Sequence, residues 1–273
     1  MPSIDEKRVY GTTTAATQLL VASEVGVVAV SVSDDIVGEF GIDHACTATD
    51  LATNGDALAV ATDEDVLVGD YEPTGHGPAA VVGVETTGDG SGVVAVAPDG
   101  TVSRLPTDAA DWRELGSVAE PHAADGALVA TADGVVRATN DGLEPVGLDT
   151  VTDVATRPVP YAATDGGLYR LGNGWRLVRD GAFGAVTTDA AGDAVVAATD
   201  AAVFSRGLWG SDDGAAPRDG WTRHDHSGIA AVAVEDDLLV GVTSDGTAQV
   251  TVGDGWRSRT LGIPGVERVV TVG

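Results

Sequence analysis

Residues 160–178, PYAATDGGLYRLGNGWRLV, contain a structural unit that is repeated along the chain. The small apolar residues up to Thr164 predict a strand. The Asp-Gly pair that follows predicts a tight turn, because glycine accepts a positive φ and aspartate tolerates the left-handed region. A second strand then runs through Leu171, and a Gly-Asn-Gly turn leads to a third strand that opens at Trp175. The stretch therefore predicts three antiparallel strands joined by tight turns.

The same unit recurs at intervals of about 37 residues along nearly the whole chain. The last small residues before the successive tight turns are Ser23, Thr62, Ala97, Thr131, Thr164, Thr199 and Thr243. Each interval has room for four strands of about five residues with their turns. One strand of each unit is rich in Val and Ala and free of bulky charge, as in residues 150–155 and 229–234, which suits an innermost strand crowded around an axis.

Seven four-stranded antiparallel units predict an all-β, seven-bladed β-propeller that forms a single domain over residues 1–273. The first unit starts with its second strand, at residues 18–23. Residues 266–272 form an innermost strand that no further unit follows. We therefore expect the N- and C-terminal strands to pair in one blade and close the ring. A ring of six or eight blades, or another all-β form, is the alternative.

The charge of the chain is strongly acidic. Its 42 Asp and Glu outnumber 15 Lys and Arg, for a formal net charge of −27, and Lys7 is the only lysine. Such repulsion is tolerated where salt screens it, since the Debye length falls to about 3 Å at 1 M. The composition resembles that of proteins from salt-accumulating haloarchaea; the alternative is an acidic protein from an ordinary source.

The same charge indicates that neither nucleic acid nor a membrane surface is a partner, because both are anionic. No cationic start followed by an apolar run is present, and no stretch approaches the roughly 18 apolar residues of a membrane span. The single cysteine, Cys46, excludes an intrachain disulfide framework. We expect a cytoplasmic protein.

Several stretches carry a family resemblance: residues 6–11 (EKRVYG), 37–41 (VGEFG), 167–175 (GLYRLGNGW), 255–257 (GWR) and 261–264 (LGIP). In these the chain resembles a β-propeller family of haloarchaeal genomes over its full length. The resemblance implies the propeller fold. The family has no assigned activity, so the resemblance implies no site residues.

Four residues are candidates for a ligand or metal site: His44, Cys46, His224 and His226. All lie in or beside connections that lead from an outermost strand to the next innermost strand, on the face that also carries the Asp-Gly turns. Imidazole and thiolate are ligands for zinc and similar divalent metals. No metal-binding spacing motif links them, so scattered surface residues are the competing interpretation, and no cofactor is identified.

An insertion in the longest interval, residues 207–220, carries the candidates for an interaction site, Leu208 and Trp209. Aromatic residues such as Trp are enriched at interface hot spots. The competing interpretation is that Trp209 folds back onto blades six and seven. The remaining tryptophans repeat in register and are expected to pack between blades.

The sequence contains no Gly-x-Ser-x-Gly elbow and no phosphate-binding Gly-x-x-x-x-Gly-Lys. We therefore expect a non-catalytic scaffold or ligand-sensing module that contacts a protein partner in a salt-rich cytoplasm. The alternative is a metal-dependent or small-molecule-binding enzyme that uses the histidine-bearing face.

Overall fold

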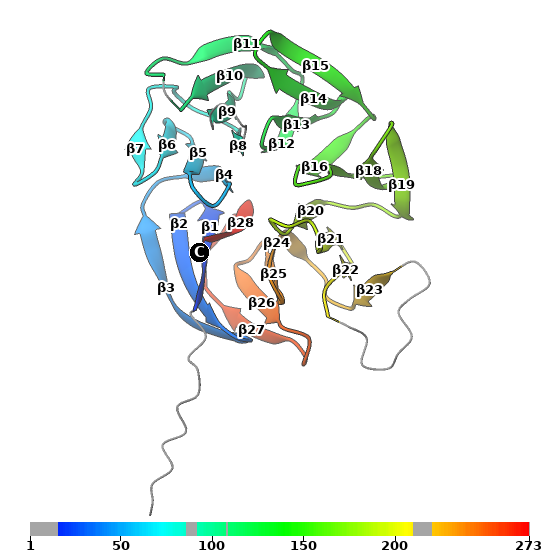
Figure 1. Cartoon of the computed structure of the whole chain (residues 1–273). Helices are drawn as coiled ribbons and strands as arrows, with labels where there is room; N and C mark the ends of the chain where they lie inside the picture. The colour runs from blue at the N-terminus through cyan, green and yellow to red at the C-terminus, as the bar shows by residue number, and fades with distance from the viewer. Residues whose placement is uncertain (1–15, 86–91, 108, 210–219, 273) are drawn as a thin grey trace, which may run out of the picture.

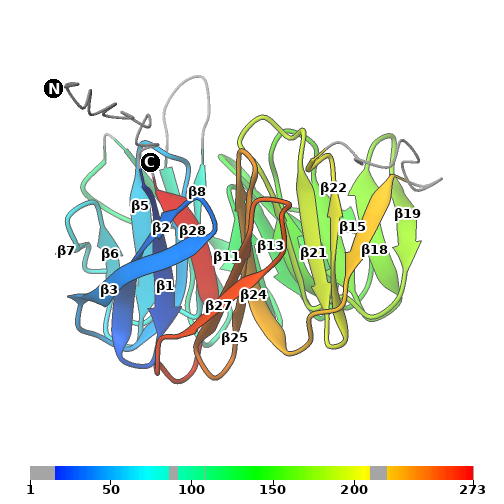
Figure 2. The same cartoon turned by 90° about the horizontal axis from the view of Figure 1, so that it is seen from below.

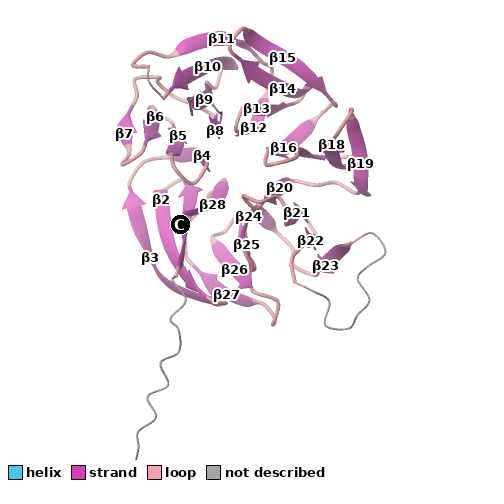
Figure 3. Cartoon of the chain, viewed as in Figure 1, coloured by secondary structure: helices cyan, strands magenta, loops and turns pink. Residues whose placement is uncertain are grey.

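The structure, a computed structural model, describes residues 16–85, 92–107, 109–209 and 220–272. In these residues the chain forms seven four-stranded antiparallel sheets arranged around one axis (Figure 1). Figure 3 shows the same view with strands and loops only. The predicted seven-bladed β-propeller is confirmed. No helix in the described part of the chain has the length and apolar character needed to cross a membrane.

Each blade runs from an innermost strand at the axis to an outermost strand at the rim. Blades one to three comprise β28 (Arg268–Val272), β1 (Thr17–Ser23), β2 (Gly26–Ser33) and β3 (Ile36–His44); β4 (Ala48–Thr53), β5 (Leu58–Thr62), β6 (Val66–Val68) and β7 (Glu72–Pro73); β8 (Val81–Glu85), β9 (Gly92–Val96), β10 (Thr101–Pro106) and β11 (Arg113–Ser117). Blades four and five comprise β12 (Pro121–Asp125), β13 (Leu128–Thr131), β14 (Gly134–Thr139) and β15 (Gly142–Gly147); β16 (Val151–Ala155), β17 (Tyr161–Thr164), β18 (Gly167–Leu171) and β19 (Trp175–Asp180). Blades six and seven comprise β20 (Ala185–Thr188), β21 (Val195–Thr199), β22 (Ala202–Arg206) and β23 (Trp221–His224); β24 (Ile229–Glu235), β25 (Leu238–Thr243), β26 (Thr247–Thr251) and β27 (Arg257–Thr260).

The ring closes in blade one, as predicted. The C-terminal strand β28 is the innermost strand of that blade and pairs antiparallel with β1, with Arg268 opposite Ala22 and Val272 opposite Gln18. The first and last strands of the described chain therefore share one sheet, and main-chain hydrogen bonds between them close the ring.

The recurring small residue before each tight turn has a structural role. In six of the seven blades, within the described residues, it is a Ser or Thr whose hydroxyl donates to a carbonyl on the far side of the turn, as Thr164 Oγ1 does to Gly167 O at 2.9 Å. The other five donors are Ser23, Thr62, Thr131, Thr199 and Thr243. A hydroxyl that bonds the local main chain stabilises a turn, which explains why this position repeats.

The hydrophobic core is divided among the contacts between blades. Within the described residues, each pair of neighbouring blades encloses one cluster of buried side chains. Alternate residues of one strand face opposite neighbours: Leu19 and Val21 pack toward blade seven, whereas Leu20 and Ala22 pack toward blade two. Because the inner part of every sheet is covered on both faces, inner strands such as β9 are continuously apolar, whereas outermost strands such as β27 are polar and exposed.

The tryptophans pack between blades, as predicted. Trp175 of β19 donates from Nε1 to Val146 O of the preceding blade at 3.1 Å. Trp112 makes an edge contact with His76, at 4.6 Å between ring centroids. Trp221 is buried in the cluster between blades five and six.

The propeller has two faces, which the side view of Figure 2 separates. An antiparallel meander reverses at every turn, so turns between second and third strands lie on the same face as the connections between blades. We call this face, which carries Asp133-Gly134 and Asp165-Gly166, the Asp-Gly face. The opposite face carries the turns between first and second strands, including Asn54-Gly55, and is called the pocket face.

Candidate ligand pocket at the propeller axis

Two of the innermost strands carry nearly the same five residues. Residues 49–53 read TDLAT and residues 152–156 read TDVAT, in blades two and five. The two segments make equivalent contacts with the next blade. The Thr49 hydroxyl donates to Ala79 O at 2.7 Å, and the Thr152 hydroxyl donates to Phe183 O at 2.8 Å. The sequence therefore places an aspartate at the same structural position of two blades.

That position belongs to one layer of the innermost strands. In every blade one inner-strand residue pairs with the residue just before the recurring turn position. Blade one contributes Arg268, and blades two and five contribute Asp50 and Asp153. The other four blades contribute Val81, Ala123, Ala185 and Ala231. The layer thus holds one cation and two carboxylates among small apolar residues.

The three charged residues are joined across the axis. Arg268 donates from Nε to Asp50 Oδ1 and from Nη1 to Asp153 Oδ1, both at 3.0 Å. Asp50 and Asp153 are 3% and 4% exposed. We call these residues the axial triad. It links blade one to blades two and five.

Both carboxylates also accept hydrogen bonds from main-chain N–H groups. Each aspartate accepts from the residue that follows it, and from a residue in the innermost strand of the next blade. The donors are Leu51 and Val82 for Asp50, and Val154 and Val186 for Asp153, at 2.8–3.0 Å. An innermost strand has no further strand on its axial side, so the carboxylates satisfy N–H groups there that would otherwise lack a partner.

Burial and pairing act in opposite directions on these groups. Burial raises the pKa of Asp50 and of Asp153, while the Arg268 guanidinium and the N–H groups oppose that rise. Burial would lower the pKa of Arg268, but the two aspartates raise it above its ordinary value. The guanidinium therefore stays charged, and two buried carboxyl groups share it.

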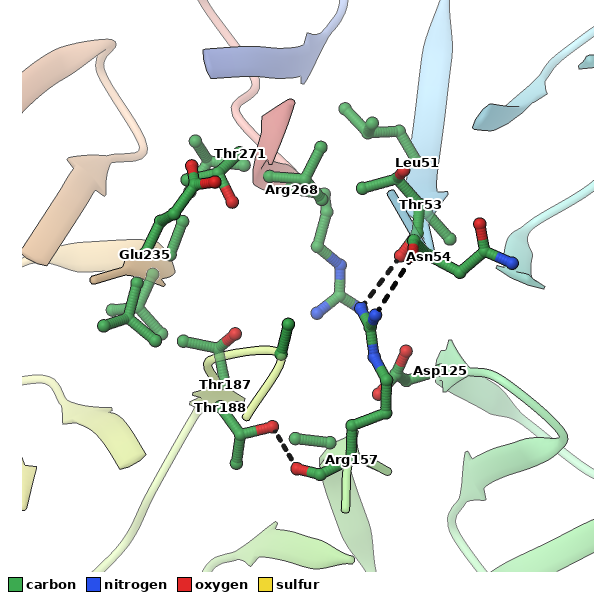
Figure 4. A pocket seen from close by; sticks show the side chains of 18 of the residues that line it. Leu51, Thr53, Asn54, Asp125, Arg157, Thr187, Thr188, Glu235, Arg268 and Thr271 are labelled. Atoms are coloured by element: carbon green, nitrogen blue, oxygen red, sulfur yellow. Dashed lines mark hydrogen bonds between the residues drawn. The ribbon is translucent and has the colours of Figure 1, made fainter. Parts of the chain in front are cut away.

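Above the axial triad, a cavity of about 280 Å³ opens on the pocket face (Figure 4). Arg268 lines one part of it, and Arg157, from the segment after β16, lines another. The remaining polar lining includes Thr53, Asn54, Asp125, Thr187, Thr188, Glu235 and Thr271. We call this cavity the central pocket.

Arg157 extends from blade five to blade two. Its guanidinium donates to the carbonyls of Thr53 and Asn54 at 3.1 and 3.3 Å, and the Thr188 hydroxyl donates to Arg157 O at 2.6 Å (Figure 4). Within the described residues no carboxylate forms an ion pair with Arg157. Its charge is therefore held in place by neutral carbonyl oxygens.

The two acidic residues of the lining differ in their partners. Asp125 Oδ2 accepts from the N–H and the hydroxyl of Thr156, at 2.6 and 2.8 Å. Glu235, the last residue of β24, has a buried Oε2 without a hydrogen-bond partner among the described residues. Figure 4 shows Glu235 near Thr271, across the cavity from the Arg157 guanidinium.

The structure places the metal-ligand candidates apart from this pocket, in two separate connections. His44 stacks on Tyr71 with ring centroids 4.6 Å apart, and Cys46, close by in sequence, is partly buried against blades one and two. His224 and His226 lie together between blades six and seven, around Trp256. In the part of the chain that the structure describes, no three His, Cys, Asp or Glu side chains gather as a metal site would require.

Leu208 and Trp209 pack against their own propeller. Leu208 is buried between blades six and seven, and Trp209 Nε1 donates to Asp237 O of blade seven at 2.9 Å. The Trp209 ring also lies against Gly253. Trp209 thus folds back onto blades six and seven, the interpretation that competed with an interaction site. Residues 210–219 of the insertion lie outside the described residues.

The sequence analysis did not identify the charged residues at the axis, and its expectation about the innermost strands was wrong. The innermost strands were expected to lack bulky charge, yet β28 begins with Arg268, and β4 and β16 carry buried aspartates. The main-chain N–H groups and the opposite charges at the axis make these residues stable there. The repeated TDLAT and TDVAT segments were the signal that could have revealed the aspartates.

The structure gives one pH-dependent prediction at the histidine pair. Burial lowers the pKa of His224 from 6.5, and His226 lowers it further. The unfolded chain therefore binds a proton below about pH 6.5 that the folded protein resists, so stability is full above that pH and is lost as the pH falls. We expect the denaturant midpoint to fall from pH 7.5 to 5.5 by less in His224→Gln than in the unmodified protein. Equal pH slopes for the two would contradict this assignment.

Solved structures share the fold at low sequence identity. The computationally designed Ika8 protein is 17% identical with a TM-score of 0.55, covering 95% of this chain and 91% of its own. The Pseudomonas aeruginosa periplasmic gluconolactonase PpgL is 12% identical with a TM-score of 0.62, covering 95% and 99%. A functionally unknown protein of Desulfotomaculum acetoxidans DSM 771 is 13% identical with a TM-score of 0.61, covering 94% and 99%. At these identities the likeness concerns the fold alone.

No curated protein matches the sequence. A family match does exist, and it spans almost every residue of the ring, from residue 3 to residue 272. The family is described as HVO_0234-like, beta propeller. The blade pattern, the closure through β28 and the match over residues 3–272 agree, and the chain belongs to this HVO_0234-like β-propeller family.

Proposed function

We propose that this protein is a non-catalytic, ligand-sensing propeller of a salt-rich cytoplasm, and that it binds a small carboxylate-bearing molecule in the central pocket. The observation that carries the proposal is the state of Arg157. Its guanidinium lies in a cavity and donates to two main-chain carbonyls, with no carboxylate paired to it among the described residues.

The composition of the chain gives weight to the lack of a carboxylate partner for Arg157 among the described residues. Acidic residues outnumber basic ones by 42 to 15, so an arginine has many carboxylates that could have evolved as partners. The carbonyls of Thr53 and Asn54 orient the guanidinium without neutralising it. Guanidinium donors match a carboxylate in geometry and charge, and such bonds are stronger than those between neutral groups.

The size and lining of the pocket favour a small polar ligand. Pockets for drug-sized molecules occupy roughly 300–1,000 Å³, and this cavity, at about 280 Å³, lies just below that range. Thr187, Thr188 and Thr271 add hydroxyls to the lining. The described lining includes no histidine or cysteine, so it offers no nucleophile with an imidazole base, which favours binding over catalysis.

The proposed binding site lies on the pocket face and not on the histidine-bearing face. The histidine-bearing face was the alternative expected from the sequence, but the central pocket opens on the opposite face. Leu208 and Trp209, the expected contacts for a protein partner, are occupied with packing inside this chain.

The test is a titration with glycolate, propionate and malate, followed by calorimetry at the lowest KCl concentration at which the protein is fully folded. Charge-assisted hydrogen bonds contribute about 1.5–3 kcal/mol, so Arg157→Gln should weaken binding at least tenfold, to order of magnitude. The matched control is Arg113→Gln, which removes the same charge from the exposed outer strand β11. Equal affinity in both variants, or no binding by the unmodified protein, would refute the proposed function.

A further inference from the structure

Glu235 is the one acidic residue of the central pocket whose described contacts leave a buried oxygen without a hydrogen-bond donor. Its Oε2 is inaccessible to solvent and has no partner. By contrast, Asp125 is bonded twice by Thr156. The aspartates of the axial triad are bonded by Arg268 and by main-chain N–H groups.

An unpartnered buried oxygen of a carboxylate is costly, because the hydrogen bonds that water supplied to it are lost on folding. Buried polar groups in folded proteins are almost always bonded, so an exception calls for a partner that the protein chain does not supply. Glu235 lines the same cavity as Arg157, across from its guanidinium (Figure 4). A donor on the molecule that occupies the cavity reaches this oxygen once the Glu235 side chain turns toward the cavity that it lines.

Resting on the proposed function above, we propose that the ligand is a small zwitterion of amino-acid size. Its carboxylate binds the Arg157 guanidinium, and its ammonium group binds the Glu235 carboxylate. The carboxylate of the ligand thus meets a guanidinium without a carboxylate partner, and its ammonium group meets the acidic side chain of the pocket that has an unbonded oxygen among the described residues.

The surroundings of Glu235 favour a cationic donor over a neutral one. Asp236 and Asp237 follow it directly in the turn after β24, and both are exposed, so the local potential attracts positive charge. Arg268, the other cation of the lining, is already shared by two aspartates and does not compete for Glu235. A cavity of about 280 Å³ accommodates a molecule of this size with a few waters.

The experiment uses a series of ω-amino acids from glycine to 6-aminohexanoate, each compared with the carboxylate of the same length that lacks the amine. Calorimetry on the full chain should show one preferred length, bound about tenfold more tightly than its matched carboxylate. Glu235→Gln, which is nearly isosteric, should abolish that preference and should not weaken the binding of the simple carboxylate, because it removes a negative charge from the pocket. The matched control is Glu114→Gln on the exposed strand β11.

A second variant retains the charge and moves it. Glu235→Asp should shift the preferred ligand to an ω-amino acid one methylene longer, because the carboxylate withdraws by one methylene. This variant also serves if Glu235→Gln fails to fold, as judged by circular dichroism.

The possible outcomes separate the two proposals. If carboxylates bind through Arg157 but the amine adds no affinity, or if Glu235→Gln does not change the preference, the zwitterion is refuted and the proposed function stands. If hydroxy acids of the same length, with a hydroxyl in place of the amine, bind as tightly as the amino acids, the donor to Glu235 is a hydroxyl and the zwitterion is also refuted. If neither carboxylates nor amino acids bind, both proposals fail.

Discussion

Replacing Arg268 by methionine is expected to lower the free energy of unfolding by about 3–5 kcal/mol, the usual cost of removing one partner from a buried ion pair. The substitution leaves Asp50 and Asp153 buried at 3% and 4% exposure, without their shared cation. It also removes contacts between blade one and blades two and five, so cooperative closure of the ring should weaken. Urea unfolding followed by circular dichroism, at several KCl concentrations, measures the change.

The matched control is Arg223→Met, which breaks an ion pair with Asp225 whose side chains are 51% and 80% exposed. Exposed pairs contribute about 0–1 kcal/mol, so this variant should lose little. The loss in Arg268→Met should also be insensitive to salt, because buried pairs are screened much less than exposed ones.

A combined variant distinguishes lost charge compensation from lost packing. Adding Asp50→Asn and Asp153→Asn to Arg268→Met removes the uncompensated charges, but each asparagine keeps one acceptor oxygen where the aspartate accepts main-chain N–H groups with two. Part of the stability should return, because the buried charges are gone, while one main-chain N–H at each site loses its acceptor. The axial triad would not have the proposed role if Arg268→Met cost no more than Arg223→Met, or if the combined variant were the least stable of the three.

Adding KCl to the unmodified protein is expected to raise its melting temperature by on the order of 10 °C between 0.1 and 2 M, because a net charge of −27 repels itself when unscreened. The Debye length falls from about 10 Å at 0.1 M to about 3 Å at 1 M, so most of the rise should occur below 1 M. Scanning calorimetry at fixed pH measures this dependence.

Two controls separate screening from other effects of salt. Sucrose strengthens burial by exclusion from the protein surface but does not screen charge, so it should not reproduce the steep rise at low concentration. Sodium chloride should reproduce it at equal ionic strength. A melting temperature that stays constant from 0.1 to 2 M KCl would contradict the electrostatic account.

The ring could be predicted from sequence because its determinants are local and repeated. In six blades a hydroxyl such as that of Thr164 bonds across the turn, and in blade three the small residue Ala97 takes this place, so the turn position is visible without knowledge of the fold. The continuous apolar pattern of the inner strands follows from blades that pack against a neighbour on both faces. Closure through β28 was predictable for the same reason, since one strand was missing at the start of the chain and one was left over at its end.

The central pocket could not be predicted in this way because its residues are far apart in sequence and meet only once the ring is closed. Asp50, Asp153 and Arg268 come from three blades, and a single aspartate in a strand gives no indication that it faces the axis; only the likeness of residues 49–53 to residues 152–156 marks the two aspartates. Arg157 follows a strand, and the sequence alone does not distinguish it from any other arginine in a loop. Its place in the pocket is known only from the structure, where its guanidinium donates to the carbonyls of Thr53 and Asn54 in blade two.

The sequence analysis placed its metal-site candidates at the histidines because it inferred chemistry from residue type. His224 and His226 pack with Trp256, and His44 stacks on Tyr71, so the aromatic character of these rings accounts for the contacts they make. The metal hypothesis stays a prediction.

The measurement that tests the central claim most directly is a crystal structure of the full chain, grown in KCl and soaked with the preferred ω-amino acid of the series. We predict density in the central pocket, with a carboxylate within hydrogen-bond distance of the Arg157 guanidinium and no such density in crystals of Arg157→Gln. An empty pocket in the unmodified protein at a saturating ligand concentration, or the same density in both, would contradict it.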